Sequence, residues 1–315
     1  MKLTNEQLQT IYYGALYFGE TEDGYLKSFQ YIQPQMDHFE KTADFYYDRC
    51  MASSAKTLEF TTTATKFSFD YKIVWIGSFD TVELEVDGLI SKIYHVKDIE
   101  KEGTLSFEMP EGTKSVVVYL PADATIWLKN FEIDAEVTPV KKGEKVLWMG
   151  DSITQGYGPL RSAHTYVSVA NKLLNYDILN QGIGGYVYDK AILMDMNGYR
   201  PDKIIISMGT NQHFHEDMTG IEEYYALLHE IYKDTPVLCI TPIWRGDTPD
   251  GAKTLERFCE RLKDICKKYA NITVVEGFKL VPHASEYFLD NLHPNELGSE
   301  LYGRNLVEAI KAAGF

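Results

Sequence analysis

The chain has 315 residues, enough for two domains and a large hydrophobic core, so it needs no disulfide or metal ion to fold. Its composition, 44% hydrophobic and 24% charged, is that of an ordinary globular protein and excludes a disordered one. The net charge is −15, and residues 1–140 alone hold 12 basic against 23 acidic residues. Because an acidic surface repels phosphate backbones and anionic lipids, neither nucleic acid nor a membrane is expected as a partner.

The N-terminus and the cysteines carry no sign of export. Polar residues stand where a signal peptide would place its apolar segment, and no stretch reaches the roughly 18 apolar residues of a membrane span. A cytoplasmic location is therefore the default expectation, with a trimmed secretory precursor left open. The cysteines show no CxxC pair and are expected to be reduced, small apolar residues rather than zinc ligands; they are Cys50, Cys239, Cys259 and Cys266.

The first part of the chain is predicted to be rich in β-strands. Residues 66–71 and 82–86 alternate apolar and polar side chains, and the second run ends at a typical turn pair, Asp87-Gly88. Several such short runs follow one another between residues 58 and 133, which favours an all-β sandwich of the jelly-roll kind over residues 1–140. The tyrosine-rich first 50 residues are expected to add a helix and an edge strand.

After a short linker at residues 137–143, strands and helices alternate. The clearest helix spans residues 252–270, where apolar side chains fall on one face of a 3.6-residue period. Strand–helix alternation predicts a parallel sheet with helices on both faces, formed by residues 141–315. The expected strands are Lys145–Met149, Tyr176–Leu179, Lys203–Met208, Val237–Ile243 and Ile272–Val275.

Chemically useful residues follow four of these strands. In an open α/β sheet, ligands bind beyond the carboxyl ends of the strands, so the four segments are expected to share one rim. They offer a hydroxyl, glycine N–H groups, a carboxamide and an acid–imidazole pair, which is what acyl transfer requires. The segments are Gly150-Asp151-Ser152-Ile153, Asn180-Gln181-Gly182-Ile183-Gly184-Gly185, Gly209-Thr210-Asn211 and Asp290-Asn291-Leu292-His293-Pro294.

Each of these residue types has a defined task in that chemistry. Ser152 becomes a nucleophile when His293 takes its proton, and Asp290, three residues before His293, can orient the imidazole. An oxyanion needs hydrogen-bond donors, which the backbone N–H groups of Ser152 and Gly185 and the side chain of Asn211 can supply. The predicted catalytic residues are therefore Ser152, His293 and Asp290.

In their order along the chain, the four segments resemble the signature blocks of the SGNH (GDSL-type) hydrolases, over about residues 145–313. The resemblance implies a three-layer, flavodoxin-like α/β domain, serine esterase activity, and Gly185 and Asn211 as oxyanion donors. Two blocks depart slightly: Ile153 stands where Leu is commoner, and Gln212 replaces a frequent Asp. A β-sandwich before such a domain is similar to two-domain bacterial carbohydrate esterases, which implies removal of O-acetyl groups from sugars.

Other interpretations of these residues are weaker. A dinucleotide loop would need a third glycine where Val187 stands, and His213 with His215 more simply belongs to a solvated loop than to a metal site. No cofactor and no metal are therefore expected.

The substrate and the oligomeric state are not fixed by these patterns. A small-molecule or oligosaccharide ester is expected, and two alternatives to the carbohydrate esterase stay open. One is a lysophospholipase-like or broad short-chain ester hydrolase, and the other is an inactive carbohydrate-binding protein. Four residues after strand ends are candidates for lining the mouth of the site, although core or surface packing is an equal explanation; they are Tyr157, Tyr186, Trp244 and Arg245.

Overall fold

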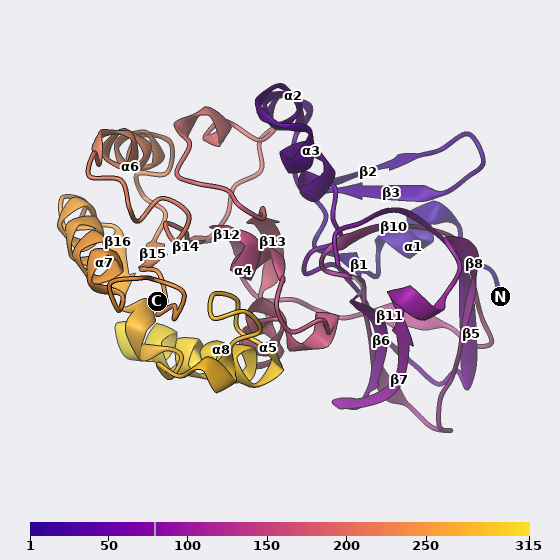
Figure 1. Cartoon of the computed structure of the whole chain (residues 1–315). Helices are drawn as coiled ribbons and strands as arrows, with labels where there is room; N and C mark the ends of the chain where they lie inside the picture. Colours follow the sequence, from indigo (N-terminus) through magenta and orange to yellow (C-terminus); the bar gives the residue numbers. More distant parts are fainter. Residues whose placement is uncertain (79) are drawn as a thin grey trace.

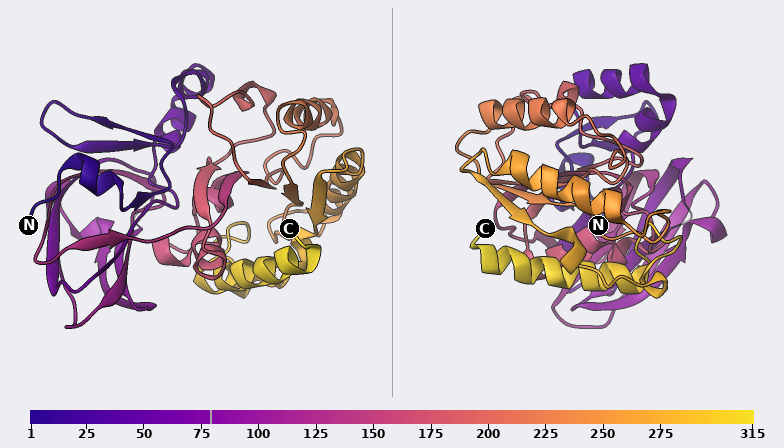
Figure 2. Two further views of the ribbon diagram at one scale, coloured as in Figure 1. Left: turned by 180° about the vertical axis from the view of Figure 1, so that it is seen from behind. Right: turned by 60° about the vertical axis from the view of Figure 1, so that its left-hand side comes forward.

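The computed structural model describes residues 1–78 and 80–315. Two β-sheets are built from the first 140 residues, and a third, surrounded by helices, is built from residues 145 onward (Figures 1 and 2). The two parts lie side by side, with the short helix α3 (Asp44–Cys50) between them.

The N-terminal part contains two antiparallel sheets that share one core. Their strand orders are β2-β3-β10-β5-β8 and β1-β4-β9-β6-β7, and β11 is added to β4. Phe60, Leu84 and Val118 from one sheet meet Phe69 and Phe107 from the other, which confirms the predicted all-β sandwich. The strands are β1 (Tyr12–Tyr13), β2 (Tyr17–Glu20), β3 (Leu26–Phe29), β4 (Thr57–Thr62), β5 (Lys66–Ile76), β6 (Thr81–Val86), β7 (Leu89–His95), β8 (Glu102–Glu108), β9 (Lys114–Tyr119), β10 (Ala124–Ile133) and β11 (Val137–Pro139).

The first 50 residues add more helix than the sequence suggested. Besides β1–β3 they form α1 (Asn5–Gln9), α2 (Gln33–Thr42), which has a proline in its first turn, and α3. Met36 and Phe39 of α2 are buried in the same core as Leu147 and Ile204 of the third sheet. Residues before 140 thus help to cover the α/β part, and the domain boundary at residue 140 stays a prediction.

The third sheet is parallel throughout, with the order β13-β12-β14-β15-β16. This order corresponds to the flavodoxin-like arrangement 2-1-3-4-5. Gly150 of β12 pairs with Gly182 of β13 and Ser207 of β14, so three carboxyl ends lie at one level of the sheet. The strands are β12 (Lys145–Gly150), β13 (Asp177–Gly182), β14 (Lys203–Ser207), β15 (Val237–Ile240) and β16 (Ile272–Val275).

Helices cover both faces of this sheet, as the strand–helix alternation predicts. In β12, Val146 and Trp148 pack with α5 and α8 on one face, and Leu147 and Met149 pack with α2, α6 and α7 on the other. The four cysteines are buried and free, as expected. The helices and 3₁₀ turns are α4 (Ser152–Gln155), α5 (Tyr166–Leu174), α6 (Thr219–Ile231), α7 (Lys253–Cys266), α8 (Glu296–Ala313), η1 (Val96–Asp98), η2 (Ser162–His164), η3 (Lys190–Ile192), η4 (Gly277–Lys279) and η5 (Ser285–Tyr287).

Within residues 1–78 and 80–315, no helix combines the length and the apolarity needed to cross a bilayer.

Candidate active site

Ser152 is the first residue of α4, directly after the tight turn that follows β12. A Cβ on Gly150 would lie 2.1 Å from the hydroxyl oxygen of Thr154, so only glycine lets the chain pass so close to the new helix. Asp151 caps α4, because its carboxylate accepts a hydrogen bond from the Ile153 N–H at 3.1 Å. The turn places Ser152, which is 9% exposed, at the carboxyl rim of the sheet.

A chain of hydrogen bonds runs from Ser152 to Asp290. The Ser152 Oγ lies 2.8 Å from His293 Nε2, and His293 Nδ1 lies 2.8 Å from Asp290 Oδ2. With a proton on Nδ1 donated to Asp290, Nε2 is free to accept the hydroxyl proton. Hydrogen bonds therefore join the three predicted catalytic side chains in the order Ser152, His293, Asp290.

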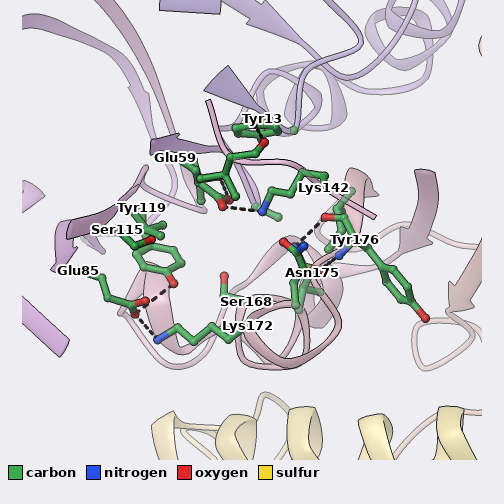
Figure 3. A pocket seen from close by; sticks show the side chains of 18 of the residues that line it. Tyr13, Glu59, Glu85, Ser115, Tyr119, Lys142, Ser168, Lys172, Asn175 and Tyr176 are labelled. Carbon is green, nitrogen blue, oxygen red and sulfur yellow. Dashed lines mark hydrogen bonds and ion pairs between the residues drawn. The ribbon is translucent and has the colours of Figure 1, made fainter. Parts of the chain in front are cut away.

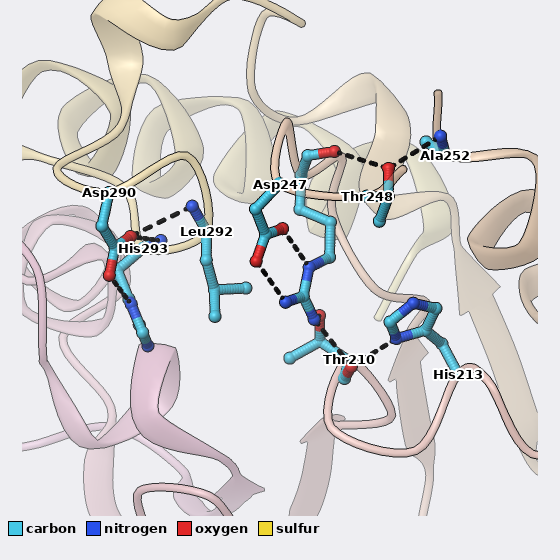
Figure 4. Close-up of polar contacts among 9 residues, drawn as sticks. Thr210, His213, Asp247, Thr248, Ala252, Asp290, Leu292 and His293 are labelled. Carbon is cyan, nitrogen blue, oxygen red and sulfur yellow. Dashed lines mark hydrogen bonds and ion pairs between the residues drawn. The ribbon is translucent and has the colours of Figure 1, made fainter. Parts of the chain in front are cut away.

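Asp290 is fixed as a charged acceptor. The N–H groups of Leu292 and His293 both donate to its Oδ1, at 3.0 and 2.8 Å (Figure 4). Burial alone would raise the pKa of Asp290, but the hydrogen bonds from His293 and Leu292 outweigh it and hold the pKa below its ordinary value. The carboxylate therefore stays ionised where an imidazole needs it.

The imidazole is also held by packing. The Tyr157 ring stands edge-on to the His293 ring, with centroids 4.6 Å apart, and the Leu289 N–H donates to the His293 carbonyl at 2.8 Å. A Cβ on Gly158 would lie 2.2 Å from the Pro294 carbonyl oxygen, so the two loops touch through backbone. Tyr157 therefore lies beside His293, which agrees with its interpretation as a residue that lines the mouth of the site.

The glycine loop after β13 presents a free amide. The Tyr186 N–H closes a turn onto the Ile183 carbonyl at 3.1 Å, and Gly185 has φ +77° at the third position, as in a type II turn. The Gly185 N–H has no acceptor within the described part of the chain. Asn211 Nδ2 donates one hydrogen to the Tyr186 carbonyl at 2.9 Å, which leaves its second N–H available.

Arg245 supports the segment that carries Asn211. Its guanidinium pairs with both carboxylate oxygens of Asp247, at 2.6 and 2.7 Å, and donates to the Thr210 carbonyl at 2.9 Å. In Figure 4, dashed lines join Asp247 and Thr210 to the guanidinium group that lies between them. Arg245 was expected as a lining candidate, and the structure shows it bound to the backbone next to Asn211.

Two other lining candidates are packing residues. Tyr186 is buried against Phe39 and Tyr46, and Trp244 stacks on His283 with centroids 5.6 Å apart.

Helix α3 brings residues of the N-terminal part to the glycine loop, a contact that no sequence pattern predicts. The Tyr46 hydroxyl donates to the Gly185 carbonyl at 3.2 Å, and a Cβ on Gly185 would lie 2.8 Å from the Phe45 ring. A Cβ on Gly184 would lie 2.6 Å from Nε of Arg49, so the Arg49 side chain covers this glycine too. No residue spacing links positions 45–49 to position 185, so only the folded chain reveals the contact.

A separate hollow of about 320 Å³ lies between the β4–β9–β6 strands and α5 (Figure 3). Tyr13, Tyr119 and Tyr176 line it, and its charges are already paired, Lys142 with Glu59 at 2.5 Å and Lys172 with Glu85 at 2.8 Å. It lies at the amino end of β13, whereas Ser152 and Gly185 follow the carboxyl ends of their strands. The hollow is therefore no part of the candidate site.

The His213–His215 loop lies near the site. His213 Nδ1 lies 2.7 Å from the Thr210 carbonyl oxygen (Figure 4). In the part of the chain that the structure describes, no three His, Cys, Asp or Glu side chains form a group able to hold a metal ion.

Part of the chain is similar to a known protein family. Residues 148–301 match the model of the GDSL-like Lipase/Acylhydrolase family. No curated protein sequence is similar enough to this chain to count as a match.

Three solved structures illustrate the shared two-part fold. A salicylyl-acyltransferase, SsfX3, from a tetracycline biosynthetic pathway aligns over 96% of this chain and 94% of its own, with 15% identity and a TM-score of 0.76. The acetyl xylan esterase Est2A from the rumen bacterium Butyrivibrio proteoclasticus aligns over 99% and 97%, with 15% identity and a TM-score of 0.65. A family two carbohydrate esterase from Clostridium thermocellum, in complex with cellohexaose, aligns over 83% and 93%, with 18% identity and a TM-score of 0.65.

The family match and the fold define the class, which is that of the ester hydrolases with an SGNH-type α/β domain. Residues 148–301 of the α/β part are similar to the GDSL-like lipase/acylhydrolase family, and the fold of the whole chain is that of the two-part enzymes above.

Proposed function

We propose that this protein is a serine esterase that removes short acyl groups, O-acetyl above all, from carbohydrate. Ser152 is the nucleophile, His293 is the general base, and Asp290 orients the imidazole and stabilises the imidazolium that forms when His293 takes the proton. The observation that carries the proposal is the pair of 2.8 Å contacts that joins the three side chains in sequence.

The acylation step follows from these positions. His293 Nε2 takes the Ser152 proton while Oγ forms a bond to the ester carbonyl carbon. The carbonyl oxygen becomes an oxyanion, stabilised by the N–H groups of Ser152 and Gly185 and by the free amide hydrogen of Asn211. The carbonyl double bond then re-forms, the bond to the alcohol oxygen breaks, and His293 passes its proton to the departing sugar oxygen.

Deacylation repeats the sequence with water. His293 takes a proton from a water molecule, whose oxygen attacks the acyl-serine carbonyl. The Ser152–acyl bond breaks, the proton returns to Ser152, and the carboxylic acid leaves. Asp290 stabilises the imidazolium formed in each half of the cycle and stays charged itself.

The carbohydrate assignment is supported by the two-part architecture and by its neighbours. An acetyl xylan esterase and an esterase in complex with cellohexaose share the sandwich and the α/β part with this chain. In the proposed reaction the acyl group is acetyl and the leaving group is a sugar alcohol oxygen, as in a sugar deacetylase.

Replacement of the nucleophile tests the proposal. Ser152→Ala is expected to abolish hydrolysis of p-nitrophenyl acetate and acetate release from acetylated oligosaccharides, with an unchanged melting temperature. Full activity in this variant would refute the proposal. Rates that climb toward long acyl chains would instead identify a lipid ester hydrolase, and an inert wild type that binds glycans would identify a carbohydrate-binding protein.

A further inference from the structure

Two buried side chains, Asp123 and Gln155, connect the N-terminal sandwich to the glycine loop at Gly184 and Gly185. Asp123 lies in the loop between β9 and β10 of the sandwich, and Gln155 is the last residue of α4, three positions after Ser152. Gln155 Nε2 donates to Asp123 Oδ1 at 2.5 Å, and Gln155 Oε1 accepts from the Gly184 N–H at 2.6 Å. Asp123 and Gln155 are both buried, so neither contact competes with solvent.

These contacts lie next to the peptide that carries the proposed oxyanion donor. Gly184 and Gly185 are the two central residues of the turn closed by Tyr186 and Ile183, so the Gly185 N–H belongs to the central peptide. The direction of a central peptide is what distinguishes type I from type II turns, and glycine at the third position allows the type II direction. A turn free to flip would point this N–H away from the oxyanion.

Both sides of that peptide are anchored by residues outside the loop. On one side, Gln155 accepts from the Gly184 N–H. On the other, the Tyr46 hydroxyl donates to the Gly185 carbonyl at 3.2 Å. Asp123 and Tyr46 come from the N-terminal part of the chain, and Gln155 comes from the nucleophile helix.

We propose that Asp123 and Gln155 are positioning residues that hold the Gly185 N–H toward the oxyanion, which gives the sandwich an indirect part in catalysis. The inference rests on the proposed esterase function. Asp123 acts through Gln155, and neither residue touches the reacting atoms. Burial raises the pKa of Asp123 to about 6, so above that pH its carboxylate forms a charge-assisted bond that is stronger than a neutral one.

The test compares two variants of the chain with a matched control, assayed at pH 8 with p-nitrophenyl acetate. Gln155→Met keeps the side-chain length but removes both hydrogen bonds, and it is expected to lower kcat about 10- to 100-fold with little change in KM. Gln35→Met is the control, because Gln35 is also buried, donates to the Ile192 carbonyl and accepts from the Ile32 N–H, yet it does not touch Gly184. The control is expected to keep its kcat whatever its melting temperature.

Asp123 variants test the same chain from the sandwich side. Asp123→Ala is expected to lower kcat, and Asp123→Asn, whose amide oxygen still accepts from Gln155, is expected to restore most of it. The double variant Asp123→Ala, Gln155→Met is expected to be no slower than Gln155→Met alone, because Asp123 acts only through its contact with Gln155.

Binding of a boronic acid, which forms a tetrahedral adduct with an active serine, is expected to weaken in parallel with kcat. A kcat per folded enzyme that is unchanged in Gln155→Met and Asp123→Ala would overturn the inference. Full activity of Ser152→Ala would instead overturn the proposed function, so the two failures are distinguishable.

Discussion

The two sides of the candidate site are built differently. The proton-transfer side comes wholly from the α/β part, where Asp290 and His293 lie three residues apart and meet through one local turn. The proposed oxyanion side has contacts from distant parts of the chain: Tyr46 donates to the Gly185 carbonyl, and Asp123 accepts from Gln155, which in turn accepts from the Gly184 N–H. A local turn can be encoded by a short motif, whereas a peptide direction needs contacts from several parts of the chain.

The largest expected effect comes from breaking the proton-transfer side. His293→Ala is expected to lower kcat/KM for p-nitrophenyl acetate by about 10⁴-fold or more, because among the described residues only the His293 side chain hydrogen bonds to the Ser152 hydroxyl. A variant with a tenth of the wild-type rate would contradict the role of His293.

The next effect concerns the interface that brings the sandwich to the site. Glu83 of β6 has no exposed side-chain surface, and its carboxylate pairs with Arg161 at 2.5 Å and accepts from the Ala163 N–H at 3.1 Å. Burial alone would raise the pKa of Glu83, but hydrogen bonds from Arg161 and Thr81 outweigh it and lower the pKa, so the group stays charged. Glu83→Ala is expected to cost about 3–5 kcal/mol of unfolding free energy, because it leaves Arg161 unpaired.

Urea denaturation measures that cost against a solvent-exposed ion pair. Glu223, which pairs with Lys190 at 2.7 Å, is half exposed, and Glu223→Ala is expected to change stability by less than about 1 kcal/mol. Equal losses in the two variants would show that the Glu83 pair does not hold the two parts together.

A smaller effect is expected when one proposed oxyanion donor, the Asn211 side chain, is removed. Asn211→Ala is expected to lower kcat by about 10²–10³-fold with KM nearly unchanged, since it removes one donor that acts mainly in the transition state. Phe214→Ala changes an exposed residue of the same loop and is the control that is expected to keep wild-type kcat. A change in KM alone would assign Asn211 to substrate binding instead.

The smallest effect appears in the pH dependence of stability. Burial raises the pKa of Asp80, which accepts from the Asp123 N–H at 2.9 Å, from 3.8 to about 8. The folded chain then keeps a proton that the unfolded chain releases, so the free energy of unfolding falls as the pH rises between these values. Asp80→Asn is expected to raise the melting temperature more at pH 8.5 than at pH 5.5, and equal shifts would contradict this assignment.

The grouping of Ser152, His293 and Asp290 in space could be predicted from the sequence. Buried strand runs identify the parallel sheet, and the carboxyl ends of parallel strands must share a rim, so Ser152, Gly185 and Asn211 could be expected there. Asp290 and His293 are close in sequence and pair locally.

The supports could not be predicted, for a physical reason. Alternation in residues 82–86 identifies the strand β6, but it does not tell that the α/β part covers the charged face with Glu83 and Glu85. Asp123 and Gln155 are 32 positions apart and lie in different predicted domains. A contact between two folded surfaces depends on how the surfaces dock, which no local pattern records.

Covalent labelling tests the central claim, that Ser152 is activated by His293, most directly. A fluorophosphonate reacts with a serine only when a base removes its proton, and intact-mass and peptide mass spectrometry locate the adduct. The account predicts a single adduct on Ser152 in the wild type, none in Ser152→Ala and little in His293→Ala. An adduct on another residue, or labelling of Ser152 at an undiminished rate without His293, would contradict it.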